Sequence, residues 1–385
     1  MIIRCILMYI SGIGKTKFGV LDKGLPELAY EAMYDAIEDS GIPITEIDAI
    51  YVGNFLGGIL QNQLHMNSLI SSLLPGLNIP IIRIETACSS SGAALHQAII
   101  SLSRYKNVLV LGVEKMNGID NSLLTKGICA AGDCCMDQNN GLIFPAAYAL
   151  VAKKHMEEYG TTADDLALVA LKSHENANLN EKAHFYHKKV DLDMIKRSPI
   201  VCTPLRLFDC SPISDGAAAL VVSREKRSKR DIKILASSLK TDTISLAQRK
   251  DITSFKATRL AAAEAYKEAG ISAKDVDIAE VHDCFTISEL VAMEDLGFCK
   301  PGESKDLVRK GETKLDGRIP IGTGGGLKAN GHPIGATGAS QICEIVAQLR
   351  GEAGKRQVKG ANIGLAQNIG GVGGTCVIHI LKKED

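Results

Sequence analysis

The sequence predicts an α/β protein built from two related halves, each with a sheet covered by helices. Short apolar runs that resemble strands alternate with helical patterns along the chain, which is typical of α/β folds. The chain has 385 residues, too many for one ordinary core and suited to two domains of similar size. One order of elements also occurs twice. We therefore expect a mostly parallel sheet in each half.

The first elements are visible from periodicity and from their ends. The apolar residues 1–10 are too few for a membrane anchor or a signal peptide, so we interpret them as a first strand. Residues 25–40 form an amphipathic helical pattern that Gly41 ends in the usual way. A strand follows at residues 48–53, and residues 81–84 and 108–113 resemble two more.

The same order returns from residue 260 onward. A helical pattern at 260–269 ends at Gly270 and precedes a strand at 277–281, and runs at 218–222 and 377–381 resemble buried strands. Three short matches keep their order: Ser40-Gly41-Ile42 with Ala269-Gly270-Ile271, Ile47-Asp48 with Val276-Asp277, and Ser91-Gly92-Ala93 with Thr337-Gly338-Ala339. We predict an N-terminal half (1–114 and 206–230), an insertion between its sheet-forming parts (115–205) and a C-terminal half (231–385).

The stretch from Glu85 to Ala94 places one cysteine, Cys88, between a strand and a helix over residues 93–102. A thiol at a helix N-terminus lies near free backbone N–H groups, which favour the thiolate and thus a nucleophile. The alternative is that Cys88 is one more buried apolar thiol, as most free cysteines are. This stretch alone leaves both interpretations open.

Two further stretches carry residues suited to acid–base chemistry. His282 and Cys284 directly follow the strand at 277–281, and His332 lies in a glycine-rich loop before Pro333. Active sites of α/β sheets lie at the carboxyl ends of the strands, so one cleft could collect all three. A cysteine nucleophile needs a nearby base, and His332 is the natural one. Cys284 could move a second proton.

The composition excludes several classes of function. The formal net charge is zero, so no electrostatic footprint for nucleic acid or an anionic membrane is present. The 11 cysteines follow no disulfide framework, which together with the lack of a signal peptide predicts reduced thiols and a cytoplasmic location. Gly14-Lys15-Thr16 lacks the first glycine of a phosphate-binding loop, because residue 9 is Tyr9.

Other cysteines and histidines are interpreted as structural. Cys129, Cys134 and Cys135 have the wrong spacing for a zinc knuckle or an iron–sulfur cluster, so no metal site is expected. We expect surface positions in loops for His174, His184 and His187, and a structural role for His155 on a helix.

Taken together, these motifs resemble those of the thiolase family. The similar stretches are Thr86 to Gly92, Ser211 to Ala219, Gly331 to Gly338 and Asn368 to Gly374, and they span most of the chain in the family's order. The resemblance implies the thiolase fold, a five-layer α-β-α-β-α sandwich of two duplicated halves with an inserted loop domain. His282-Asp283-Cys284-Phe285 replaces the ordinary Asn-Glu-Ala-Phe, and Asn368 stands where ordinary thiolases have their second catalytic cysteine. This pattern resembles the sterol-carrier-protein-type and archaeal branch.

The resemblance also implies a role for each residue. Cys88 takes the acyl group, His332 activates it and helps hold the thioester oxygen, and Cys284 moves the α-carbon proton. His282 stands where the ordinary family has its oxyanion-hole asparagine. The backbone N–H groups of Cys88 and Gly370 bind the oxyanion of the tetrahedral intermediate.

The implied reaction is reversible, CoA-dependent cleavage of a 3-oxoacyl-CoA through an acyl-Cys88 intermediate, or the reverse Claisen condensation. CoA and acyl-CoA are then substrates, and no cofactor or metal is bound. Acetoacetyl-CoA is the default substrate, and a bulky aromatic one such as benzoylsuccinyl-CoA is the alternative. A decarboxylating ketoacyl synthase and a non-catalytic scaffold subunit also stay open. The resemblance further implies a homodimer or a dimer of dimers, and a small zinc-ribbon and OB-fold partner protein.

Overall fold

The computed structural model describes residues 7–384 of the chain. Its first strand, β1, spans Tyr9–Lys15, so the predicted first strand lay too early. Residues 1–6 of that prediction lie outside the described residues. The predicted helix at residues 25–40 is confirmed exactly as α1, Leu25–Ser40, and ends at Gly41 in a left-handed conformation.

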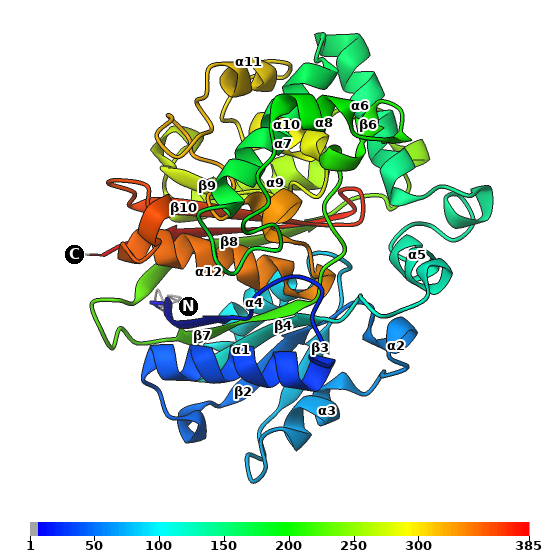
Figure 1. Cartoon of the computed structure of the whole chain (residues 1–385). Helices are drawn as coiled ribbons and strands as arrows, with labels where there is room; N and C mark the ends of the chain where they lie inside the picture. Colours follow the sequence, from blue (N-terminus) through cyan, green and yellow to red (C-terminus); the bar gives the residue numbers. More distant parts are fainter. Residues whose placement is uncertain (1–6, 385) are drawn as a thin grey trace.

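Nine strands form a sheet that consists of two parts (Figure 1). The N-terminal part has the order β3 (Ile81–Ile84), β2 (Ala49–Gly53), β4 (Asn107–Glu114), β7 (Gly216–Ser223) and β1. The C-terminal part continues with β8 (Ile232–Thr241), β11 (Thr375–Lys382), β10 (Ile363–Gly370) and β9 (Ile278–Glu280). Only Tyr9 and Ile10 of β1 pair with β8, so the two parts join at one end of β1.

The expectation of mostly parallel sheets was wrong, because five of the eight strand pairs are antiparallel. Only β2–β3, β2–β4 and β9–β10 are parallel. The reason is the length of the connections. Between β10 and β11, for example, residues 371–374 are too few for the crossover that parallel neighbours need.

Helices and the two parts of the sheet alternate in five layers. Helices α1 and α3 (Met66–Ser72) cover the outer face of the N-terminal strands with one apolar core. Helices α4 (Ser90–Ser101) and α12 (Thr337–Arg350) fill the centre between the two parts. Helices α9 (Lys256–Ala269) and α10 (Thr286–Asp295) cover the C-terminal strands on the far side, as Figure 1 shows.

The duplicated motifs meet in the central layer, where α4 and α12 both begin. Gly92 and Gly338 approach each other so closely that a Cβ on Gly338 would lie 2.4 Å from the backbone nitrogen of Gly92. The Ser91 hydroxyl accepts a hydrogen bond from the backbone N–H of Ala339 across 3.0 Å. Glycine is therefore required where the two halves touch.

The segment between β4 and β7 is rich in helices. It contains α5 (Asn121–Cys129), α6 (Phe144–Tyr159), α7 (Ala163–Ala177), α8 (Leu192–Arg197) and the short hairpin of β5 (Ile200–Cys202) and β6 (Leu205–Arg206). Two short helices, α2 (Gly57–Leu60) and α11 (Ser304–Arg309), complete the fold. In residues 7–384 no helix has both the length and the apolar character needed to cross a membrane.

Candidate active site

Cys88 lies on a sharp turn between β3 and α4. The residue before it, Ala87, has a φ of 52°, a left-handed conformation that a residue with a Cβ rarely adopts. Local hydrogen bonds hold the turn: the Ser89 hydroxyl donates to the Thr86 carbonyl across 2.7 Å, and the Ser90 hydroxyl donates to the Ala87 carbonyl across 2.6 Å. The turn therefore presents the thiol just before the first turn of α4.

His332 follows a single π-helical turn, Gly326–Asn330, and Gly331. Gly331 has a φ of 112°, which favours glycine. The imidazole Nδ1 lies 2.7 Å from the Thr337 hydroxyl, and this hydroxyl itself donates to the Pro333 carbonyl. Because the hydroxyl has one proton to give, it accepts from His332, so Nδ1 carries the ring proton. The Nε2 atom of His332 is then a free base.

His282 follows the end of β9 and is fully buried. The amide nitrogen of Asn368 lies 3.2 Å from its Nδ1 atom and also donates to the Cys88 carbonyl across 3.1 Å. An amide nitrogen can only donate, so Nδ1 accepts and the ring proton is on Nε2. This N–H has no hydrogen-bond partner among the described residues.

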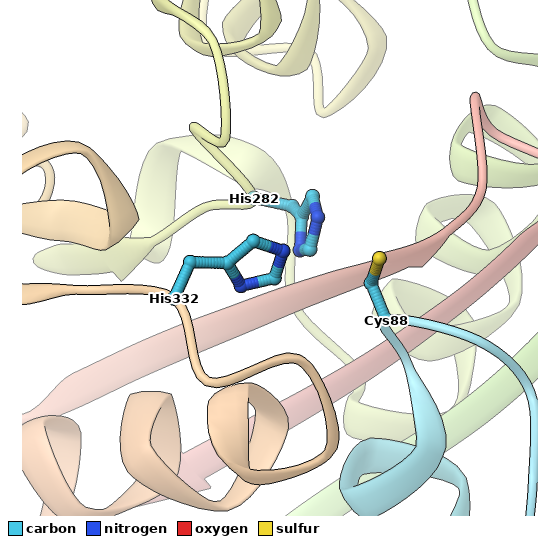
Figure 2. Close-up of side chains that lie close together, drawn as sticks. All are labelled: Cys88, His282 and His332. Atoms are coloured by element: carbon cyan, nitrogen blue, oxygen red, sulfur yellow. The ribbon is translucent and has the colours of Figure 1, made fainter. Parts of the chain in front are cut away.

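The three side chains converge on one point (Figure 2). One ligand-type atom each from Cys88, His282 and His332 lies within 4.8 Å of the others. The Cys88 thiol stands opposite the two rings, whose planes lie at 84° with centroids 5.1 Å apart. The structure therefore brings together the predicted nucleophile, its predicted base and the predicted oxyanion donor.

Cys284, the fourth predicted residue, lines a cavity of about 150 Å³ together with Cys88 and His332. Most of the other residues lining this cavity are apolar: Met116, Ile128, Phe144, Pro145, Pro212, Ile213, Phe285 and Ile334. Three thiols, those of Cys88, Cys284 and Cys210, and one imidazole thus line one apolar cavity. Such a cavity excludes water, so that hydrogen bonds to a developing negative charge are strong.

Comparisons with known proteins agree with this geometry. The family model described as the thiolase N-terminal domain matches residues 8–226, and the model described as thiolase C-terminal domain-like matches residues 238–383. This chain belongs to the thiolase family.

Three relatives define its place in that family. The chain is 44% identical to an acetyl-CoA acetyltransferase of Methanothermobacter thermautotrophicus, over 97% of this chain and 99% of the relative. It is 34% identical to sterol carrier protein 2 of Bos taurus, over 97% and 72%, and 33% identical to the benzoylsuccinyl-CoA thiolase subunit BbsB of Thauera aromatica, over 91% of each. The protein is thus an acyltransferase of the thiolase type, in the sterol-carrier-protein-type and archaeal branch.

Solved structures confirm the thiolase fold. The Ltp2-ChsH2(DUF35) aldolase superposes with a TM-score of 0.85 at 25% identity, over 98% of both chains. Human mitochondrial 3-ketoacyl-CoA thiolase has a TM-score of 0.74 at 17% identity, over 98% of this chain and 99% of that one. The second likeness concerns the fold alone.

The charge state of the Cys88 thiol differs from the expectation for a helix N-terminus. Burial raises the pKa of Cys88, and this outweighs the lowering by its own N–H and that of Gly371. Burial also lowers the pKa of His332 to about 3. This thiolase therefore holds a neutral thiol beside a neutral imidazole, and the proton must move when the sulfur attacks.

The backbone donors near Cys88 include one that the sequence did not predict. The backbone N–H of Gly371 lowers the pKa of the Cys88 thiol, and Gly371 lines the cavity. Gly370, the predicted donor, ends β10 so near the nucleophile turn that a Cβ there would lie 2.3 Å from the Thr86 carbonyl oxygen. Its role as an oxyanion donor stays a prediction.

Cys284 has a polar neighbour that was also missed. The fully buried Tyr148 donates its hydroxyl proton to the Gly371 carbonyl across 3.2 Å and stacks on Phe285 with 4.6 Å between ring centroids. Burial raises the pKa of Cys284 to about 12, although Tyr148 and Ser288 hydrogen bonds lower it. The thiol therefore stays protonated at neutral pH and can act as an acid.

Asp283 joins the two histidine segments. Its carboxylate accepts from the backbone N–H of Leu327 across 2.7 Å and of Lys328 across 3.4 Å, in the loop that leads to His332. A Cβ on Gly326 would lie 2.0 Å from this carboxylate. The motif residue between His282 and Cys284 thus fixes the approach of the loop with His332.

One prediction for the remaining histidines was wrong and one was correct only in part. His174 was expected at the surface but is buried on α7, where its ring stacks on Phe185 at 5.1 Å, because the apolar face of that helix packs inward. His184 is half-buried and hydrogen-bonded to Ser214. His187 is exposed as predicted. His155 is structural as predicted, with Thr161 and Glu294 as partners.

Proposed function

We propose that this thiolase cleaves a 3-oxoacyl-CoA with CoA through an acyl-Cys88 intermediate, and that it runs the condensation in reverse. The observation that carries the proposal is the convergence of Cys88, His282 and His332 within 4.8 Å, at a cavity that Cys284 also lines. Acid–base side chains suffice for this chemistry, so CoA enters as a substrate and no resident cofactor is invoked.

The first half of the cleavage forms the acyl-enzyme. The free Nε2 of His332 takes the Cys88 proton as the sulfur attacks the 3-oxo carbon of the substrate. The N–H groups of Cys88 and Gly370 bind the oxyanion that forms on that carbon. The bond between C2 and C3 then breaks, and the acyl group stays on Cys88.

The second half releases both products. The leaving enolate keeps its thioester oxygen against the N–H groups of His282 and protonated His332, and the Cys284 thiol gives its proton to the α-carbon. The Cys284 thiolate then takes the proton of the CoA thiol, the CoA sulfur attacks the thioester at Cys88, and the Cys88 sulfur leaves and regains its proton from His332. The products are acetyl-CoA, or another acyl-CoA, and an acyl-CoA shortened accordingly.

Acetoacetyl-CoA is the substrate that the cavity supports best. The described residues that line the cavity include no Lys or Arg, and Met116, Ile128 and Phe144 make the lining apolar. A short apolar acyl group fits this lining. Benzoylsuccinyl-CoA, the substrate in the name of the BbsB relative, carries a free carboxylate that would need a cationic partner, so it is the second candidate.

The deciding experiment incubates the purified chain with acetoacetyl-CoA and CoA and follows loss of the 3-oxoacyl enolate absorbance. Mass spectrometry should show an acetyl group on Cys88, and C88A should show neither cleavage nor acetylation. A decarboxylating synthase would instead release CO₂ from a malonyl-type thioester and leave acetoacetyl-CoA intact. A scaffold subunit would show no acetyl-Cys88 with any acyl-CoA. Either result contradicts the proposal.

We also propose an assembly. The edge strand β3 has an open side, and its Ile82 side chain is 46% exposed, which suits pairing with β3 of a second copy. The 25%-identical Ltp2-ChsH2(DUF35) aldolase includes a DUF35 protein in its name, which supports a small partner of that kind here. Light scattering on wild type and I82K, with and without such a partner, tests both parts. A monomeric wild type contradicts the dimer.

The domain division and the location complete the proposal. Residues 115–205 form a loop domain over the substrate, between an N-terminal half (1–114 and 206–230) and a C-terminal half (231–385). Phe144 and Pro145 of this segment line the cavity, which supports the substrate-covering role.

The ten described cysteines are free thiols, which suits the reducing cytoplasm.

A further inference from the structure

We propose that Asn368 is a positioning residue that fixes the tautomer of His282. It thereby makes the cluster of Cys88, His282 and His332 a site for an oxyanion and prevents it from becoming a tight metal site. The catalytic part of this inference rests on the proposed function, whereas the part about metal affinity does not.

The position of the Asn368 amide is set from three sides. Its nitrogen donates one proton to the Cys88 carbonyl across 3.1 Å and the other to Nδ1 of His282 across 3.2 Å. The carbonyl can only accept, so it determines which end of the amide is nitrogen. A Cβ on Gly92 would lie 2.7 Å from the amide oxygen, and one on Gly338 would lie 2.4 Å from it. The amide is thus tightly packed between the starts of α4 and α12.

The consequence is a preformed donor. With Nδ1 of His282 accepting, the ring proton is on Nε2, where no described residue accepts it. A buried donor without a partner carries a free-energy cost. Burial also keeps the pKa of His282 well below its usual value, so the ring stays neutral. An oxyanion beside Cys88 would give this N–H its missing acceptor, so the cost is recovered when substrate binds.

The same three residues resemble a zinc site in composition and spacing. One thiolate and two imidazoles are common zinc ligands, and their ligand atoms lie within 4.8 Å of one another (Figure 2). His332 offers a lone pair at Nε2, because Thr337 accepts its Nδ1 proton. His282 offers none, because its Nε2 carries the proton. The wild type therefore has two ready ligands and a third that is blocked.

An aspartate at position 368 would reverse this arrangement. A carboxylate only accepts, so His282 would place its proton on Nδ1 and expose a lone pair at Nε2. Carboxylate, histidine and metal in a row are the usual arrangement in zinc sites, and loss of such a carboxylate costs 10–100-fold in metal affinity. We therefore expect N368D to lose the oxyanion donor and to gain a metal ligand.

The test titrates Co²⁺ into the full chain and follows its thiolate charge-transfer band, alongside the rate at which deuterium from D₂O enters the α-carbon of acetyl-CoA, a step that passes through the enolate held by His282. N368D should bind Co²⁺ at least about tenfold more tightly than wild type and should incorporate deuterium about 10²-fold more slowly. N176D, a matched control in which another buried asparagine amide donates to the Gly322 carbonyl, should keep wild-type Co²⁺ affinity. The double variant N368D/H282A should bind Co²⁺ no more tightly than wild type.

The variants H282A and H332A test the tautomer assignment even if N368D does not fold. H282A should leave the Co²⁺ affinity of the otherwise wild-type chain unchanged, whereas H332A should weaken it at least tenfold. Weakening of Co²⁺ binding by H282A, or wild-type Co²⁺ affinity and deuterium incorporation in folded N368D, overturns the proposal. If the chain cleaves no acetoacetyl-CoA while N368D still gains Co²⁺ affinity, the proposed function fails and the tautomer assignment stands.

Discussion

The Thr337 hydroxyl at the start of α12 accepts a hydrogen bond from Nδ1 of His332 across 2.7 Å and donates a hydrogen bond to the Pro333 carbonyl. This relationship keeps Nε2 of His332 unprotonated and turned toward the cluster. Thr337→Val keeps the shape of the side chain but removes the acceptor, so the wrong tautomer becomes populated. We expect acetylation of Cys88 by acetyl-CoA to slow by roughly 10–100-fold, measured by quenched-flow mass spectrometry.

Thr337→Ser is the control for this change. Serine keeps the hydroxyl and loses one methyl group, so its acetylation rate should stay within about threefold of wild type. Equal rates for the valine and serine variants would show that the hydroxyl does not set the tautomer.

The pH dependence of acetylation should be unusually flat. Burial raises the pKa of Cys88 and lowers that of His332 to about 3. A histidine with the usual pKa near 6.5 would lose its base form as the pH falls below 6.5. Here both groups stay neutral from pH 5.5 to 8.5, so the rate of Cys88 acetylation should change less than threefold. A tenfold fall between pH 7 and 5.5 would contradict the lowered pKa of His332.

Cys284 should be needed for proton transfer at carbon but not for acyl transfer. Its pKa of about 12 keeps the thiol protonated, as an acid that meets an enolate requires. Cys284→Ala should cut the incorporation of deuterium from D₂O into the α-carbon of acetyl-CoA by at least 10². Acetylation of Cys88 should stay within fivefold of wild type. If deuterium still enters at the wild-type rate, another group moves the proton.

The sequence predicted the elements whose signals are local. Helix α1 was correct to the residue because its period and its closing Gly41 both lie within the segment. Strand β10 was missed, since Gln367, Asn368 and several glycines make it look like a polar loop, although it is buried in the sheet. Strand direction was wrong because it depends on how neighbouring strands are connected.

The candidate site likewise contains residues that local motifs reveal and a residue that they do not. Cys88, His282, Cys284 and His332 stand in recognisable motifs, and the structure brings them to one cavity or cluster. Asn368 was noted only as the residue in place of a cysteine. Its contact with His282 spans 86 positions in the chain, so no local pattern reveals it.

Glu114 should matter for stability through one dense set of hydrogen bonds. Its fully buried carboxylate accepts from the Asn54 amide and from the backbone N–H groups of Phe55, Leu56 and Gly335, at 2.9–3.0 Å. Glu114→Gln places an amide where only acceptors fit, so two donors lose their partner. We expect the free energy of unfolding to fall by about 2–4 kcal/mol, measured by urea unfolding. The exposed Glu38→Gln should change it by less than about 0.5 kcal/mol.

His174 should destabilise the fold, and increasingly so in acid. It is buried between Phe185 and Phe208, and neither ring nitrogen has a hydrogen-bond partner among the described residues. Burial, with Lys328 and Lys188 nearby, lowers its pKa to about 3. His174→Phe removes two unpaired polar atoms, so the free energy of unfolding at pH 7.5 should rise by about 1–2 kcal/mol.

The sign of the pH effect follows from linkage. Unfolded His174 binds a proton below about pH 6.5, and the folded protein does not until about pH 3. Each fall in pH across this range therefore stabilises the unfolded state relative to the folded state. The change is about 1.4 kcal/mol per pH unit once the pH is well below 6.5. The advantage of His174→Phe over wild type should thus grow by about 1 kcal/mol or more between pH 7.5 and 5.5, in paired urea titrations. His187→Phe, at an exposed histidine, should show no such growth. A constant difference between wild type and His174→Phe would mean that His174 binds a proton in the folded protein.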